Sequence, residues 1–297
     1  MVAKKDINGI AVDFGGTKTA VARIHAGELV AREQVSSDGA IGVEEQVARM
    51  AQLIKELEPR QDECIGVAAT GRIDSDGNWY AVNTSTLNGI SKVPLAQMLH
   101  EVLGQRVRVV NDALAGALGE YHIGAGTGAR SLGFITVSTG VGGGFILQGN
   151  PLMSANGLAG HVGFTTSRQL TTECGCGRRS TVESIAAGRA LARLAAEQGH
   201  PGLDGRAVYE AALAGEPWAK QLVEQSAAVI AELCANTCAT MGLDRIVLGG
   251  SVGLAQGFLE LVRSYQAQEP ELFHCDVVAG SLGQDSALLG ALLAQDI

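Results

Sequence analysis

The chain has 297 residues, of which 46% are hydrophobic and 18% are charged, and its formal net charge is −9. A chain of this length and composition can bury a large core and form two domains, which excludes a disordered protein. The acidic balance also excludes a general nucleic-acid or membrane-surface binder, because phosphate backbones and anionic lipids recruit an excess of lysine and arginine.

No segment approaches the roughly 20 consecutive apolar residues that span a bilayer, and the first ten residues lack the hydrophobic core of a signal peptide. We therefore expect a cytoplasmic protein without membrane partners, in a compartment where disulfides are rare. Four cysteines lie in apolar segments and are predicted to be buried thiols: Cys64, Cys234, Cys238 and Cys275. Cys174 and Cys176 lie instead in a polar, glycine-rich turn.

The chain opens with a predicted hairpin over residues 9–24, in which a glycine turn joins two apolar strands. The turn follows Asp13 and reads Phe-Gly-Gly-Thr-Lys. Its glycines let the backbone approach an anion and point N–H groups toward it, and Asp13 could hold a metal ion through water. An ordinary hairpin with a tight glycine turn is the alternative interpretation.

Apolar segments of strand and helix type then alternate, which predicts an α/β fold. Helices are expected at residues 44–57, 93–103, 184–198, 218–241, 254–268 and 286–294. Strands are expected at residues 64–70, 107–110, 245–248 and 275–279.

Residues 109–113 predict a strand that runs directly into a helix, with Asn111 and Asp112 at the junction. Either side chain could simply cap the helix. A carboxylate at the carboxyl end of a strand also lies where α/β folds bind ligands, and there it can take a proton from an attacking alcohol.

Residues 132–147 repeat the first hairpin pattern, with a turn that contains Thr139, Gly140 and Gly142 to Gly144. Two such turns, half a chain apart, indicate two related lobes. We expect an N-terminal lobe over residues 1–115, completed by a C-terminal helix at about 284–297, and a C-terminal lobe over residues 116–283.

A third glycine site, Gly249 and Gly250, follows a strand and opens a helix, where it could approach an adenosine or only pack helix on strand. The sequence has no G-x-x-x-x-G-K-[ST] motif, which excludes a P-loop.

The polar segment between the second hairpin and the next helix also carries reactive side chains. His161, Cys174 and Cys176 are three side chains of metal-ligand type, but a closed structural zinc site needs four. Ser180 and Glu183 fit a capping box at the start of the helix, which would make Glu183 structural.

Together these motifs resemble the ROK family of sugar kinases and repressors in order and spacing. They are Asp13-Phe-Gly-Gly-Thr17, Val110-Asn-Asp-Ala113, the glycine-rich run from Ser138 to Gly144, Gly157-Leu-Ala-Gly-His161, Cys174-Gly-Cys-Gly177 and Gly249-Gly-Ser251. The resemblance covers nearly the whole chain. It implies an actin-like ATPase (ribonuclease H-like) fold of two lobes around a cleft, with ATP and Mg²⁺ as cofactors, a hexose as substrate and a homodimer as the assembly.

The resemblance also implies a role for each residue that matches a family motif. Asp112 corresponds to the catalytic base. The residues matching sugar contacts are Gly71, Arg72, Asn111, Asp112, His161 and Glu183. The residues matching ATP contacts are Asp13, Gly15, Gly16, Thr17, Lys18, Thr139, Gly140, Gly142, Gly143, Gly144, Gly249 and Gly250.

The implied reaction is ATP-dependent phosphorylation of the 6-hydroxyl of a sugar. His161 stands where many glucokinase-type members have a glutamate, and the surrounding loop favours an amino sugar, N-acetyl-D-mannosamine, and a place in sialic acid catabolism. N-acetylglucosamine, glucose or another hexose is the alternative, and Thr86 stands where an asparagine is often found.

Two departures from the family concern zinc. The family site usually has one histidine and three cysteines, but Phe164 stands in the place of the histidine and Thr181 in that of the third cysteine. Cys174 and Cys176 alone are too few for a closed site, so we expect no bound zinc.

Two functions of other classes are weighed against the kinase. ROK repressors carry an N-terminal helix-turn-helix domain, and the phosphate turn at Asp13 leaves no room for one in this sequence. A chain with this net negative charge is also not expected to present a basic face for nucleic acid. A sugar-binding protein without catalysis is the other alternative, and the retention of both glycine turns and Asp112 argues against it.

Overall fold

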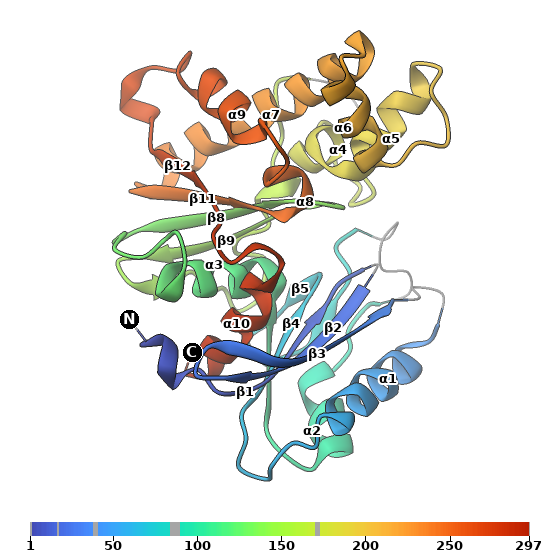
Figure 1. The fold of residues 1–297 in the computed structure, drawn as a ribbon, viewed down its shortest axis with the longest axis vertical. Coiled ribbons are helices and arrows are strands. Elements are labelled where there is room, and N and C mark those ends of the chain that lie inside the picture. Colours follow the sequence, from blue (N-terminus) through green and yellow to red (C-terminus); the bar gives the residue numbers. More distant parts are fainter. Residues whose placement is uncertain (1, 17, 38–40, 84–89, 170–172, 297) are drawn as a thin grey trace. The chain divides into compact units, whose positions relative to one another are not determined.

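The computed structural model describes residues 2–16, 18–37, 41–83, 90–169 and 173–296. The chain forms two compact units (Figure 1). The first contains Met1–Thr127, Pro151–Gly160 and Asp285–Ile297, and the second contains Gly128–Asn150 and His161–Gln284. The boundary predicted after residue 115 falls inside a helix, α3, that lies wholly in the first unit.

The first unit is built on a five-stranded sheet with the strand order β3-β2-β1-β4-β7. β1 pairs antiparallel with β2 and parallel with β4, and β4 pairs parallel with β7. The strands are β1 (Gly9–Phe14), β2 (Lys18–His25), β3 (Glu28–Ser36), β4 (Ile65–Ala69) and β7 (Val107–Asn111). A separate small hairpin consists of β5 (Arg72–Ile73) and β6 (Trp79–Tyr80).

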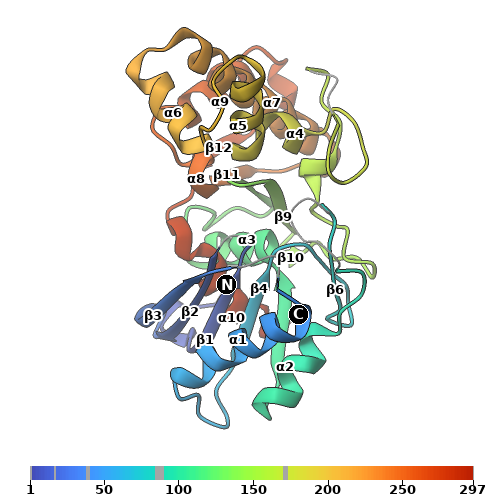
Figure 2. The ribbon, with the colours of Figure 1, turned by 90° about the vertical axis from the view of Figure 1, so that its right-hand side faces the viewer.

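Helices cover both faces of this sheet (Figures 1 and 2). They are α1 (Val43–Glu56), α2 (Leu95–Leu103), α3 (Asp112–Ile123) and α10 (Ser286–Leu293). Large side chains of the sheet, such as Ile10, Val12 and Phe14, pack with those of α1 and α2 in one apolar core. Burial of such side chains is the main force that stabilises the unit.

The opposite face is lined by small residues, which let α10 and α3 approach closely. A Cβ on Gly66 would lie 2.4 Å from the Ala291 carbonyl oxygen, and one on Gly290 would lie 1.7 Å from the Ala115 carbonyl oxygen. The C-terminal helix therefore completes the first unit, and it fixes the start of α3 against the sheet.

The second unit repeats the topology of the first. Its sheet has the order β10-β9-β8-β11-β12, again with an antiparallel hairpin followed by two parallel strands. The strands are β8 (Leu132–Val137), β9 (Val141–Leu147), β10 (Asn150–Pro151), β11 (Arg245–Gly249) and β12 (Asp276–Ala279). The expectation of two related halves is confirmed in this respect.

Helices of the second unit gather on its sheet, where α7 packs against α4, α6 and α9 (Figure 2). They are α4 (Val182–Ala186), α5 (Gly188–Glu197), α6 (Gly205–Ala214), α7 (Pro217–Met241), α8 (Gly250–Gly253) and α9 (Phe258–Gln266). Over the described residues, none of the helices is both long enough and apolar enough to cross a bilayer.

Some sequence predictions differ from the structure. The helix expected at 184–198 is two helices, because Ala187 is extended and the Gly188 N–H donates to the Ser138 carbonyl rather than continuing α4. The helix expected at 254–268 begins only at Phe258, after the short α8. Of the four cysteines predicted to be buried, Cys64 is exposed directly before β4 and Cys275 is only half-buried.

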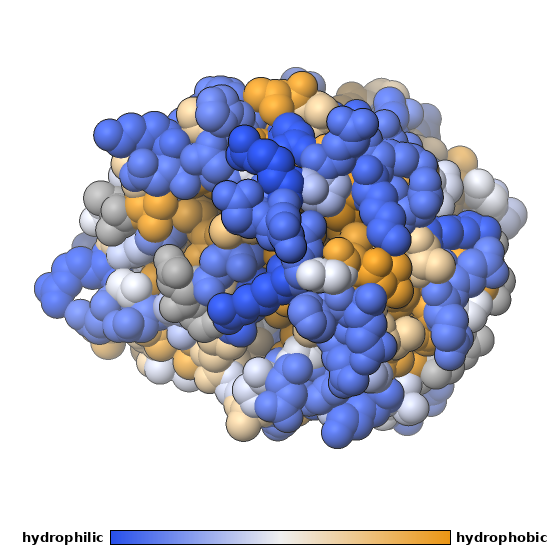
Figure 3. All heavy atoms as spheres, turned by 90° about the horizontal axis from the view of Figure 1, so that it is seen from below, coloured by the Kyte–Doolittle hydropathy of each residue, from blue (hydrophilic) through white to orange (hydrophobic). Residues whose placement is uncertain are grey.

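The outer surface of the first unit is largely polar. Figure 3 shows hydrophilic residues over most of the face it draws, with smaller hydrophobic patches between them. The edge strand β3 belongs to this polar surface, since most of its side chains are exposed. A polar edge strand gives a weak sequence signal, and β3 was not predicted.

Candidate active site

In the first unit, two acidic side chains lie where parallel strands end. β1, β4 and β7 run parallel, so their carboxyl ends share one edge of the sheet. Asp13 lies near the end of β1, and Asp112 begins α3 directly after β7. This is the edge at which α/β sheets bind their ligands.

Asn111 caps helix α3, and Asp112 does not. The Asn111 side-chain oxygen accepts hydrogen bonds from the Ala113 and Leu114 N–H groups at 3.0 and 3.1 Å. Asp112 Oδ1 accepts from Asn111 Nδ2 at 2.9 Å and from the Ala113 N–H at 2.8 Å. The helix-capping role considered for Asn111 and Asp112 therefore belongs to Asn111. The Ala113 N–H at the start of α3 holds one oxygen of Asp112 in place.

Both carboxyls are harder to ionise than an ordinary aspartate. Burial raises the pKa of Asp112 to about 6, although hydrogen bonds from Ala113, Asn111 and Thr70 oppose this rise. Burial, followed by the charge of Asp112, raises the pKa of Asp13 to about 7. Perturbed carboxyls that lie together at a strand end are typical of functional sites.

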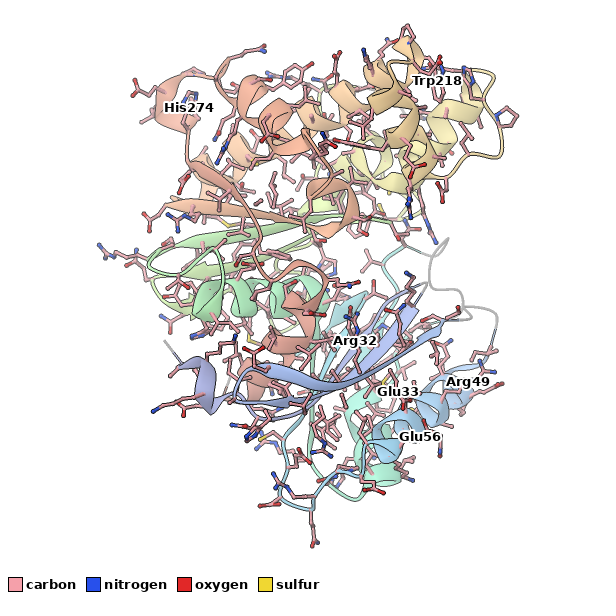
Figure 4. All side chains as sticks on the ribbon, in the orientation of Figure 1. Arg32, Glu33, Arg49, Glu56, Trp218 and His274 are labelled. Atoms are coloured by element: carbon pink, nitrogen blue, oxygen red, sulfur yellow. The ribbon has the colours of Figure 1, made fainter. Side chains whose placement is uncertain are left out.

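Two residues of this cluster were not predicted from the sequence. Arg32 lies on β3 (Figure 4) and donates from Nη1 to Asp285 Oδ1 at 2.8 Å. The charge of Arg32 lowers the pKa of Asp13, whereas that of Asp285 raises it. Asp285 directly precedes α10. Arg32 lies on the polar edge strand, where a charged side chain is ordinary, so its sequence context gave no signal.

The predicted sugar contacts Gly71 and Arg72 lie beside Asn111. Asn111 Nδ2 donates to the Gly71 carbonyl at 2.9 Å. The Arg72 guanidinium lies 3.8 Å from the centre of the Tyr80 ring and donates to the Asn156 carbonyl. The hydrogen bonds of Asn111 hold Gly71 and Asp112 together, whereas Arg72 packs on Tyr80.

The first glycine turn is closed by a hydrogen bond from the Gly15 N–H to the Lys18 carbonyl at 2.9 Å. The Ser37 hydroxyl donates to the Gly15 carbonyl at 2.9 Å, which ties the turn to the end of β3. Gly16 is half-buried and Lys18 is exposed, and Thr17 lies outside the described residues.

The second glycine turn differs from its prediction. The turn itself is Ser138 to Gly140, whereas Gly142, Gly143 and Gly144 lie inside β9, paired with Thr136, Ile135 and Phe134 of β8. Only Thr139 and Gly140 of the predicted set therefore occupy the turn. Glycines inside a strand mark a place where another group approaches the backbone closely.

Glu183 lies against this second turn, and it does not take part in a capping box. Its Oε2 accepts from the Val141 N–H at 3.1 Å, and a Cβ on Gly140 would lie only 2.5 Å from that oxygen. The cap of α4 is Thr181, whose hydroxyl accepts from the Ser184 N–H at 3.2 Å. The predicted box from Ser180 to Glu183 was wrong, and Glu183 faces the turn instead.

Gly249 and Gly250 connect β11 to α8. Gly250 has a φ of +83°, and a Cβ there would lie 2.4 Å from the Val137 carbonyl oxygen. The Ser251 hydroxyl lies 3.1 Å from that of Ser138 in the second turn. Close packing on β8 thus explains this glycine pair at least in part, and it brings α8 to the second turn.

His161, the residue predicted to replace a family glutamate, precedes a short 3-10 turn over Val162–Phe164. Its ring stacks on that of Phe164, with centroids 6.1 Å apart and an angle of 17°. Phe164 stands in the place of the family's zinc histidine and here provides an aromatic neighbour for the imidazole.

The incomplete zinc set forms no metal centre among the described residues, where no group of three or more potential ligands converges. Cys174 and Cys176 are adjacent, with their sulfurs 3.2 Å apart. Thr181, in the place of the third cysteine, is fully buried and caps α4.

The surroundings of Asp13 and Asp112 fit a magnesium ion. Mg²⁺ prefers carboxylate and water oxygens, and it is commonly held through one or two carboxylates plus substrate phosphates. Asp13 and Asp112 keep some exposure to solvent, and the raised pKa of each carboxyl is a sign that a cation beside it would be favourable.

Comparison with known proteins places the chain. The ROK family model matches residues 9–296. The chain belongs to the ROK family. N-acetylmannosamine kinase of Escherichia fergusonii is 41% identical over 289 residues, covering 96% of this chain and 98% of the relative, and that of Citrobacter koseri is 40% identical over 288 residues with the same coverage.

Solved structures of ROK proteins match the fold. The ROK hexokinase of Thermus thermophilus has a TM-score of 0.81 and 32% identity, covering 97% of each chain. A ROK glucokinase of Streptomyces griseus, solved with glucose and AMPPNP, has a TM-score of 0.84 and 27% identity, covering 98% of this chain and all of that one. The actin-like ATPase fold expected from the sequence is therefore confirmed.

Proposed function

We propose that the protein transfers the γ-phosphoryl group of ATP to the 6-hydroxyl of N-acetyl-D-mannosamine. Sugar kinase activity is supported by family membership, by relatives of 40–41% identity named N-acetylmannosamine kinase, and by the ATP analogue in the Streptomyces griseus glucokinase. The observation that carries the proposal is the Asp112 carboxyl at the end of β7, held by Asn111 and the Ala113 N–H.

Asp112 is the general base of the proposed reaction. With a pKa of about 6, its carboxyl is mostly ionised at neutral pH and accepts a proton more readily than an ordinary aspartate. It takes the proton of the 6-hydroxyl as the oxygen attacks the phosphorus in line. Because the α3 N-terminus and Asn111 fix Asp112 Oδ1, the base is oriented before the substrate arrives.

Magnesium, when bound with ATP, neutralises charge on the phosphoryl oxygens in transfers of this kind. We assign Asp13 to hold it, through water, beside Asp112. The backbone N–H groups of the two glycine turns would bind the nucleotide phosphates, and Gly249 and Gly250 would lie near its adenosine. The close packing of Gly250 on β8 makes this last assignment the least supported of the three.

Sugar recognition is assigned to Gly71, Arg72, Asn111, His161 and Glu183, the residues that match the sugar contacts of the family. An imidazole can both donate and accept hydrogen bonds, whereas the glutamate it replaces only accepts when ionised. His161 therefore changes the hydroxyl and amide pattern that the pocket accepts. N-acetylglucosamine, glucose and other hexoses are the alternatives.

We extend the proposal to the setting of the enzyme. It would act in the cytoplasm, as a homodimer, on an amino sugar released during sialic acid catabolism, without nucleic-acid or membrane partners. The names of the relatives support the amino sugar. The resemblance of the motifs to the ROK family supports the dimer.

A coupled assay of ADP release over a panel of hexoses tests the proposal. The panel contains N-acetylmannosamine, N-acetylglucosamine, glucose and mannose, and we expect the highest kcat/KM with the first. An Asp112→Asn preparation run in parallel excludes a contaminating kinase. ADP release with none of the sugars would refute the activity, and a higher kcat/KM with another sugar would move the substrate assignment to it.

A further inference from the structure

The first unit contains a cavity of about 110 Å³ beside the strand β7. Its walls come from β7, from the β5–β6 hairpin, from the starts of α2 and α3, and from residues 152–159. The segment 152–159 is held to the β5–β6 hairpin by a hydrogen bond from the Ser75 N–H to the Ala155 carbonyl at 3.3 Å. β7 is the last strand of its sheet, so the cavity follows a strand edge that no other described strand covers.

One wall of the cavity carries a cation for which the described residues offer no counterion. Arg108 of β7 is half-buried, and its Nε is buried with no hydrogen-bond partner among the described residues. No ion pair joins it to a carboxylate in that part of the chain. Burial, and then the neighbouring charge of Arg106, lower the pKa of Arg108. Guanidinium groups removed from water are normally paired, because an unpaired charge is costly to desolvate.

Two carboxylates line the same cavity but leave Arg108 uncompensated. Asp74 is occupied by its own turn, since its oxygens accept from the Asp76 and Asn78 N–H groups, from Asn78 Nδ2 and from the Tyr80 hydroxyl. These hydrogen bonds lower the pKa of Asp74 against the opposing effect of burial. Asp76 is exposed at the rim. Neither carboxylate lies within ion-pair distance of Arg108.

We propose that this cavity binds a small oxyanion, a carboxylate or a phosphate group, through the guanidinium of Arg108 with Arg106 at the opening. The planar guanidinium donates two parallel hydrogen bonds to such a group. Since one water occupies about 30 Å³ of liquid, the cavity has room for an oxyanion with a few further atoms but not for a nucleotide. Asn111 lines the cavity with Leu114, so the site adjoins the candidate catalytic group without including Asp112.

Calorimetric titration of the full chain tests this proposal with two probes, inorganic phosphate and acetate, at an ionic strength kept constant with sodium chloride. We expect saturable binding of at least one probe, and the comparison of the two identifies the class of oxyanion. Arg108→Gln should weaken that binding at least tenfold, because a charge-assisted hydrogen bond is lost. Arg49→Gln removes an equal charge from the exposed face of α1 and should leave the binding unchanged (Figure 4).

If phosphate binds elsewhere, for example at a nucleotide site, its affinity should be the same in the wild type and in Arg108→Gln. Equal affinities in the two proteins would therefore overturn the proposal. Absence of saturable binding with both probes would overturn it as well. Removal of an unpaired, half-buried charge should not lower the melting temperature of the ligand-free protein. If Arg108→Gln does not fold, the titration is repeated with Arg108→Lys, which keeps the charge. We expect this variant to bind the oxyanion saturably but more weakly than the wild type, and an unchanged affinity would overturn the proposal.

Discussion

The two sheets of this protein share one strand order but differ in what stands at the ends of their hairpins. In the first unit, the β1–β2 turn lies beside Asp13 and Asp112, whose pKa values burial raises to about 7 and about 6. In the second unit, the β8–β9 turn is packed against Glu183, which accepts a hydrogen bond from the Val141 N–H. The same topology thus presents two carboxyls with raised pKa values in one unit and a backbone turn held by a carboxylate in the other.

From this difference we infer that the repeated hairpin determines where a site forms. The first residues of the helix that follows a parallel strand determine which chemical groups the site contains. α3 begins with a carboxylate directly after β7, so the first unit holds an acid at the strand end. In the second unit, β11 is followed by Gly249 and Gly250, which bring the backbone of α8 close to β8. The first unit is therefore suited to proton transfer, and the second to the binding of groups through its backbone.

The largest expected effect comes from Asp112→Asn. Loss of a general base typically lowers turnover by about 10²–10⁴-fold, and we expect kcat to fall by this amount while ATP affinity stays nearly intact. The matched control is Asp62→Asn, which changes an exposed aspartate of the same unit. Steady-state kinetics and calorimetry measure both quantities, and a variant that keeps more than half of the wild-type kcat would remove Asp112 from the mechanism.

The same substitution should stabilise the fold at neutral pH. Burial raises the pKa of Asp112 in the folded state, so between about pH 4 and pH 6 the folded chain binds more protons than the unfolded chain. Stability contributed by this group therefore falls as the pH rises through that window. Because one pKa unit corresponds to ~1.4 kcal/mol, we expect Asp112→Asn to gain about 1–3 kcal/mol in urea unfolding at pH 7.5. A lower free energy of unfolding in the variant would contradict the claim that burial of the ionised Asp112 carboxyl destabilises the fold.

The pH profile of the reaction is the third prediction. Because the base must be ionised, kcat/KM should fall about tenfold for each pH unit below the pKa of Asp112, which is about 6. Burial and the charge of Asp112 raise the pKa of Asp13 to about 7, so Asp13 is still protonated while Asp112 ionises, and Asp13→Asn should leave the acidic limb of the profile in place. An acidic limb that moves to lower pH in this variant would contradict the prediction, because it would show that Asp13 ionises before Asp112.

A smaller effect is expected in the second unit from Gly140→Ala. The added Cβ would lie 2.5 Å from Glu183 Oε2, so the carboxylate must move and lose its hydrogen bond to the Val141 N–H. Because we assign Glu183 to sugar recognition, its displaced carboxylate should also lose a hydrogen bond to the sugar. Such a bond to a charged group is worth ~1.5–3 kcal/mol, so we expect the KM for the sugar to rise about tenfold or more. Gly42→Ala is the matched control, since its Cβ meets only ordinary contacts. Equal KM values in the two variants would separate Glu183 from sugar binding.

The smallest effect concerns zinc. We expect elemental analysis of the purified protein to find little or no zinc, because Phe164 cannot coordinate a metal and the Thr181 hydroxyl caps α4. Phe164→His combined with Thr181→Cys should complete the tetrahedral set with Cys174 and Cys176, and zinc should then raise the melting temperature. About one zinc per wild-type chain would contradict the prediction.

Local patterns predicted most of the elements that carry the site. The two hairpins and the parallel strands were predicted because glycine turns separate apolar segments of strand length. Asp112 was identified because a predicted strand runs directly into a helix at that position. The capping box from Ser180 to Glu183 was predicted wrongly, because Ser180 and Thr181 both fit a helix cap. Ser180 adopts a φ of +55°, and Thr181 pairs with Thr166, so the choice depends on a contact remote in sequence.

The sequence by itself determined the α/β class, the repeated hairpins and the family, because these depend on periodicity and on short motifs. Only the tertiary structure decided the electrostatics. It placed Arg32 beside Asp285, raised the pKa values of Asp13 and Asp112 by burial, and gave Arg108 no counterion among the residues that the structure describes. Desolvation and charge coupling depend on which segments pack together, and residues from distant parts of the chain contribute to each of these clusters.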